Sequence, residues 1–100
     1  MALQITEVRG VFSVNGELNS MNVNILERHM DRFISPKRPI ILNLERVKSM
    51  DSTAARVLQK MYVRAIKGNS ILSIVGWQNR NVLQVLKQTK TSYILSNDRA

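Results

Sequence analysis

The strongest constraint on the fold is a pair of short apolar runs on either side of one amphipathic stretch. Residues 40–44 and 71–75 are almost wholly apolar, and each has the length of a strand. Between them, apolar side chains recur at helical spacing over residues 51–67, and Gly68 is the expected helix end. The predicted buried stripe of this helix consists of Ala54, Leu58, Met61 and Ala65. A strand, a helix and a second strand in this order predict an α/β fold with parallel strands.

The first part of the chain predicts a hairpin. Residues 3–8 and 11–14 have strand periodicity, and Arg9-Gly10 between them forms the expected tight turn. Asn15-Gly16 interrupts the pattern, so we expect the second strand to end there.

A helix follows the hairpin in the prediction. Ser20 is its expected N-cap, and the helix runs to residue 35, where Pro36 and Pro39 stop it. The later segment 45–50 is expected to be a loop. The apolar run before that loop predicts a strand covered on both faces or nearly so.

The end of the chain predicts a shorter helix and a last strand. Residues 79–88 place Val82, Val85 and Leu86 on one helical face, and residues 93–95 form the expected strand. The order is therefore β-β-α-β-α-β-α, with one further strand possible at the end. No linker or internal repeat divides residues 1–100, so we expect one domain.

The composition excludes several kinds of site. The chain has no cysteine, which rules out a disulfide scaffold, a thiolate metal site and a cysteine nucleophile. His29 is the only histidine, and one histidine without cysteine makes no credible metal cluster. No glycine-rich phosphate loop or nucleophile elbow is visible. We therefore expect no cofactor and no enzymatic activity, and we interpret His29 as a half-buried structural residue.

The charge indicates an anionic partner. Fifteen Lys and Arg against seven Asp and Glu give a net charge of +8, and no acid lies between Ser52 and Asn97. Nucleic acid, a lipid surface or an acidic protein would fit this balance. Arg56, Lys60 and Arg64 recur every four residues on the long predicted helix. This basic stripe is either a docking face for an acidic partner or a solvated face.

Two motifs lie in register with these elements. One reads Gly16-Glu17-Leu18-Asn19, after the hairpin, and the other reads Met50-Asp51-Ser52-Thr53-Ala54-Ala55, at the start of the long helix. With Leu42-Asn43-Leu44, Val47 and the strand that ends at Gly76, they resemble the STAS domain over nearly the whole chain. This is the family of bacterial anti-sigma-factor antagonists. The resemblance implies one STAS-like α/β domain, with a mixed, mostly parallel sheet and helices packed mainly on one side.

The resemblance also implies a site. In the family, the serine after the aspartate accepts phosphate from a partner kinase that is itself an anti-sigma factor, and here that residue is Ser52, with Thr53 as the fallback. The family glycine that follows is Ala54 here, and the acid that closes the first motif is Asn19. The expected partner-binding residues are Gly16, Glu17, Leu18, Asn19, Met50, Asp51, Ser52, Thr53, Arg56, Lys60 and Arg64.

Several of these residues have a structural interpretation as well. Ser52 is either the phosphate acceptor or simply the N-cap of the helix. Asp51 either orients the serine hydroxyl and contacts a kinase-bound metal ion, or serves as an N-cap or first-turn acid. Trp77 is either an exposed interface anchor or a cover for the edge of the core.

Three functions follow as hypotheses. The leading one is a regulatory binding module that binds a serine-kinase anti-sigma factor, controls transcription and is switched off by phosphorylation of Ser52. The alternative is a STAS subunit of an ABC-type lipid transport complex that docks on its ATPase. A nucleic-acid-binding domain is the third, although only five aromatic residues are present and they do not interleave with the bases. We expect a cytoplasmic bacterial protein, monomeric when unbound, without a signal peptide or membrane insertion.

Overall fold

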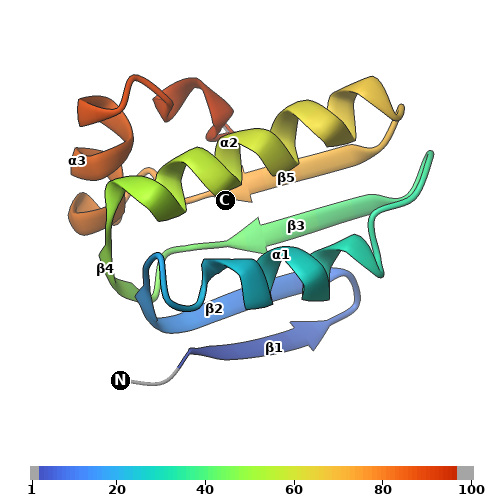
Figure 1. The fold of residues 1–100 in the computed structure, drawn as a ribbon. Helices are drawn as coiled ribbons and strands as arrows, with labels where there is room; N and C mark the ends of the chain where they lie inside the picture. The colour runs from blue at the N-terminus through green and yellow to red at the C-terminus, as the bar shows by residue number, and fades with distance from the viewer. Residues whose placement is uncertain (1–2, 97–100) are drawn as a thin grey trace.

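The computed structural model describes residues 3–96 and contains one five-stranded mixed sheet (Figure 1). The elements in chain order are β1 Gln4–Val8, β2 Val11–Leu18, α1 Val23–Asp31, β3 Pro39–Asn43, β4 Val47–Met50, α2 Ser52–Lys67, β5 Ile71–Val75, α3 Arg80–Gln88 and the 3₁₀-helix η1 Ser92–Ile94. The strand order is β1-β2-β3-β5, and β4 pairs with the end of β2. Only β1 runs antiparallel to its neighbour, as the expected mostly parallel sheet requires.

The predicted hairpin is confirmed. Arg9 and Gly10 both adopt positive φ angles, of 51° and 83°, which is the backbone of a type I′ turn. The Gly10 amide also donates to Oε2 of Glu7 at 2.8 Å, which closes the turn. This two-residue loop aligns β1 with β2 from the pair Val8–Val11 to the pair Gln4–Asn15.

Helices α1 and α2 cover the same face of the sheet (Figure 1). Alternate residues of β2 and β3, such as Phe12 and Leu42, point into that layer and are completely buried. The four predicted core residues of α2 are buried there as well. The opposite face is open, because Ile41 is 36% exposed and Ile71 51% exposed. The prediction that residues 40–44 are covered on both faces is therefore wrong. The prediction that the helices pack mainly on one side of the sheet is correct.

β2 is longer than predicted, and the predicted loop at 45–50 contains a strand. The chain passes through Gly16 in extended pairing because glycine accepts the φ of 103° found there. A register irregularity between Gly16 and Glu17 bends β2 from β3 toward β4, so Leu18 pairs with Met50. β4 is short and shows only Val47 and Met50 as apolar residues, which is why its pattern does not indicate a strand.

Both ends of α1 and the last element differ from the predictions. α1 begins at Val23, after Asn22 rather than Ser20, and ends at Asp31 rather than residue 35. α2 ends as expected near Gly68, but the left-handed residue is Asn69, with φ 57°, whereas Gly68 has φ −90°. Residues 92–94 form η1 instead of a strand, and only Leu95 makes a single parallel bridge, to Ile74.

Candidate functional site

Asp51 joins the two motifs through both of its carboxylate oxygens. Oδ1 accepts a hydrogen bond from the Ala54 amide at 2.8 Å, which makes Asp51 the N-cap of α2. Oδ2 accepts from the Ser20 amide at 2.9 Å, across 31 positions of sequence. The Asp51 amide donates to the Leu18 carbonyl at 3.2 Å. One residue therefore starts the helix and attaches the loop after β2 to it.

Ser52 is the first residue of α2 and not its cap. Because Asp51 supplies the capping oxygen, the interpretation of Ser52 as an N-cap is wrong. Ser52 and Thr53 are both exposed, and Ser52 makes no hydrogen bond through its hydroxyl to the described residues. The hydroxyl stands at the positive end of the helix, where an anion is tolerated.

The loop after β2 is built by two asparagines. The Asn19 side-chain oxygen accepts from the Met21 amide, and the Asn22 side-chain oxygen accepts from the Asn19 amide, both at 2.9 Å. The Asn22 side-chain amide donates to the Glu17 carbonyl at 2.7 Å. With the bond from Ser20 to Asp51, three successive backbone amides of the loop are held by side chains. The position of this loop relative to the start of α2 is therefore fixed.

Some predicted partner-binding residues support this surface from below. Gly16 is buried, Leu18 is fully buried, and Met50 is 9% exposed, so all three lie under the loop and the helix start. Ala54, which replaces the family glycine, is also fully buried. Its methyl group therefore packs into the core rather than standing on the exposed side of α2.

The basic stripe on α2 divides into two parts. Arg56 and Lys60 are exposed, and no acid of the described chain lies within ion-pair distance of either. Arg64 instead binds Glu27 at 2.8 Å and Asp31 at 3.5 Å, so it links α2 to α1. The first two residues are available to a partner, and the third is engaged within the fold.

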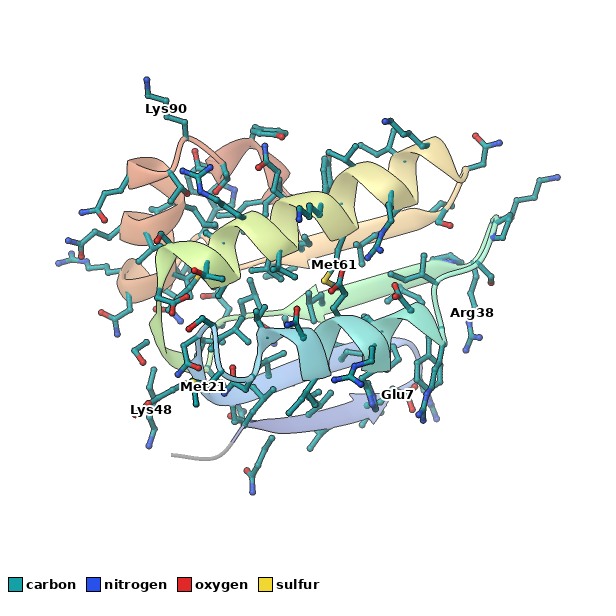
Figure 2. All side chains as sticks on the ribbon, viewed as in Figure 1. Glu7, Met21, Arg38, Lys48, Met61 and Lys90 are labelled. Atoms are coloured by element: carbon teal, nitrogen blue, oxygen red, sulfur yellow. The ribbon has the colours of Figure 1, made fainter. Side chains whose placement is uncertain are left out.

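Two residues of this region were not predicted from sequence. Met21 is 88% exposed on the fixed loop, whereas Met61 lies buried between α1 and α2 (Figure 2). The sequence signal for an exposed Met21 was that it and Ile25 are separated from the apolar positions Leu26 and Met30 of the predicted helix. Asn79 caps α3 and its side-chain amide donates to the carbonyls of Leu44 and Val47, at 2.9 and 2.8 Å, which fixes the chain before β4.

The other singled-out residues have structural positions. His29 is half-buried, and its ring lies 6.0 Å from that of Phe12 and 5.5 Å from that of Phe33, centre to centre. Trp77 is also half-buried and packs against the core, as a cover of its edge would. Among residues 3–96, no group of three His, Cys, Asp or Glu residues is arranged to hold a metal ion. No helix in the described part of the chain is long and apolar enough to cross a membrane.

Comparison with known proteins agrees with this architecture. The sequence model of the STAS domain matches residues 1–96, which is nearly the whole chain. A search of curated proteins found no match. STAS domains are in general binding modules that mediate protein–protein interactions, and the exposed, fixed surface around Ser52 suits such a role. On the match over residues 1–96 and the sheet order that accompanies it, the chain belongs to the STAS domain family.

Proposed function

We propose that this protein is a cytoplasmic, non-enzymatic anti-sigma-factor antagonist of a bacterium. It binds a serine-kinase anti-sigma factor, and phosphorylation of Ser52 by that kinase ends the interaction. Thr53 is the fallback acceptor. The observation that carries the proposal is the exposed Ser52 hydroxyl at the start of α2, which the fold leaves without a structural task because Asp51 caps the helix.

The switch works through charge and leaves the fold intact. Phosphorylation adds a charge of about −1.5 to −2 at the end of α2. The helix N-terminus accommodates this charge, and exposed Arg56 lies one turn further along the helix. Arg56 and Lys60, exposed on the same helix, have no acid of residues 3–96 within ion-pair distance, so a partner suited to this basic surface meets a charge of the wrong sign after phosphorylation.

The first experiment is a pull-down from the host with the tagged protein, followed by mass spectrometry. Retention of an ATP-binding serine kinase is expected. The purified kinase and ATP should then phosphorylate the wild type at Ser52, and Ser52→Ala should remove most of the incorporated phosphate. Retention of a transporter ATPase and permease, without phosphorylation, would replace the proposal by the lipid-transport alternative.

The second experiment measures binding to the retained kinase. Ser52→Asp should weaken the complex at least about tenfold, because a single repulsive charge at an interface costs on the order of 1 kcal/mol or more. Ser35→Asp is the matched control, since Ser35 is exposed near the chain reversal that precedes β3, away from the start of α2. Equal affinities of Ser52→Asp and Ser35→Asp would refute the charge switch.

A further inference from the structure

The N-terminal end of α1 and the loop before it carry two large apolar side chains that the core does not use. Met21 is 88% exposed and Ile25 is 55% exposed. Met21 lies in the loop two residues before α1, and Ile25 lies in the first turn of the helix, so both belong to its N-terminal end. The buried side of α1 carries Leu26 and Met30 instead. Two exposed apolar side chains at one helix start, without a role in the core, indicate a contact surface.

Met21 is held in place by the loop that presents it. Its own amide donates to Asn19 Oδ1, and the preceding amide, of Ser20, donates to Asp51. The exposed side chain therefore stands on a backbone that is already ordered. A partner that binds it loses little free energy in ordering this loop. Figure 2 places Met21 at the end of the molecule where α1 and α2 begin, which is also the end that carries Ser52.

Basic side chains continue the same side of the helix. Ile25, Arg28, His29 and Arg32 line an open depression of about 330 Å³. No acidic side chain within residues 3–96 lies within ion-pair distance of Arg28 or Arg32. The neighbouring acids Glu27 and Asp31 are bound to Arg64 on the other side of α1. The surface thus offers apolar contact at one end and unpaired positive charge at the other.

We propose that Met21, Ile25, Arg28 and Arg32, here called the α1 ridge, bind an acidic segment of the protein partner. An apolar side chain of that segment contacts Met21 and Ile25, and its carboxylates pair with the two arginines. The inference rests on the partner-binding role proposed above and adds a second surface to it, joined to Ser52 through the bond from Ser20 to Asp51. A depression favours a protruding segment over a flat lipid surface.

The test compares matched variants in binding to the purified protein that the wild type retains. Met21→Gln and Ile25→Gln should each weaken binding at least about fivefold. Ile66→Gln is the control for Ile25→Gln, because Ile66 is 57% exposed near the opposite end of α2; it should change binding less than about twofold. Arg28→Glu should also weaken binding about fivefold or more, and Lys67→Glu, the control for charge, much less.

The outcomes separate this inference from the proposed switch. Loss of binding in Ile25→Gln with none in Ser52→Asp keeps the α1 ridge and rejects the switch, and the reverse result rejects the α1 ridge alone. Equal affinities of Ile25→Gln and Ile66→Gln overturn the inference, as does failure of the wild type to retain any protein.

Sedimentation with vesicles of phosphatidylcholine and phosphatidylglycerol tests whether the α1 ridge binds a lipid surface instead. Binding to vesicles that Ile25→Gln abolishes, with protein binding unchanged, would also overturn it. Circular dichroism confirms that each variant is folded.

Discussion

Asp51→Ala removes two hydrogen bonds that hold the site together. One bond caps α2 at the Ala54 amide, at 2.8 Å, and loss of such a cap costs about 1 kcal/mol. The other joins the Ser20 amide to the second carboxylate oxygen, at 2.9 Å. Because this second bond is exposed to solvent, its loss adds about 1 kcal/mol rather than the larger value of a buried charged acceptor. We expect the free energy of unfolding to fall by about 2 kcal/mol, which lowers Tm by roughly 10 °C in a domain of this size.

Urea unfolding measures this loss. It is followed by far-UV circular dichroism and by the fluorescence of Trp77, the only tryptophan. Ser52→Ala is the matched control at the neighbouring position and should change the free energy of unfolding by less than about 0.5 kcal/mol, since the exposed hydroxyl caps nothing. Asp51→Asn should lie between the two, about 1 kcal/mol below the wild type, because asparagine retains a capping oxygen and loses the second acceptor.

Two results would refute the reasoning. If Ser52→Ala destabilised the protein as much as Asp51→Ala, the serine would be the cap, and its use as a free phosphate acceptor would lose its basis. If Asp51→Ala stayed within about 0.5 kcal/mol of the wild type, the loop after β2 would not depend on this carboxylate. Hydrogen exchange at the Ser20 and Ala54 amides gives a local check, because both should lose protection in Asp51→Ala only.

Three further substitutions test other parts of the structure. Asn79→Ala should lower the free energy of unfolding by about 3 kcal/mol, because it removes the α3 cap and the donor to the Leu44 and Val47 carbonyls. Gln84→Ala, at an exposed position of the same helix, is the control and should change it by less than about 0.5 kcal/mol. Urea unfolding measures both. Arg64→Ala should cost less than about 1 kcal/mol, because its ion pairs are exposed, and 1 M salt should reduce that difference in the same assay. Arg9→Asn should raise Tm by a few degrees in thermal unfolding, because asparagine tolerates the positive φ of a type I′ turn before Gly10; a lower Tm would contradict that turn assignment.

The parts of the fold predicted correctly from sequence have strong periodicity or special backbone residues. β3, α2 and β5 were predicted because the apolar stripe of α2 extends over four turns between two apolar runs. The turn at Arg9-Gly10 was predicted because few sequences suit two positive φ angles. β4 was missed because its apolar residues, Val47 and Met50, are three positions apart and do not alternate. The strand predicted at residues 93–95 is absent for a related reason: a strand-like composition in so short a segment does not determine whether it pairs with a neighbour.

The site was predicted in outline and missed in detail for a different reason. Ser20 was the predicted N-cap of α1, whereas the helix begins after Asn22. Serine and asparagine suit a cap equally well, so residue type does not decide between these positions. The choice depends on Asp51, which takes the Ser20 amide from a position 31 residues away. Once that bond forms, Asn19 and Asn22 hold the rest of the loop, and Met21 points into solvent. A tertiary contact therefore determined what the local pattern left open.

The distribution of charged side chains suits the proposed signal, an anionic group at Ser52. All six acids of the described chain are engaged within the protein, by ion pairs or hydrogen bonds: Glu7, Glu17, Glu27, Asp31, Glu45 and Asp51. Arg56, Lys60 and Lys67 on α2 have no acid of residues 3–96 within pairing distance. The surface that a partner meets is therefore more uniformly positive than the net charge of +8 indicates. A phosphate on Ser52 would add a charge of about −1.5 to −2 beside Asp51, whose carboxylate is bound to backbone amides, and near exposed Arg56. This one modification would make the local field more negative where the proposed partner is expected to complement positive charge.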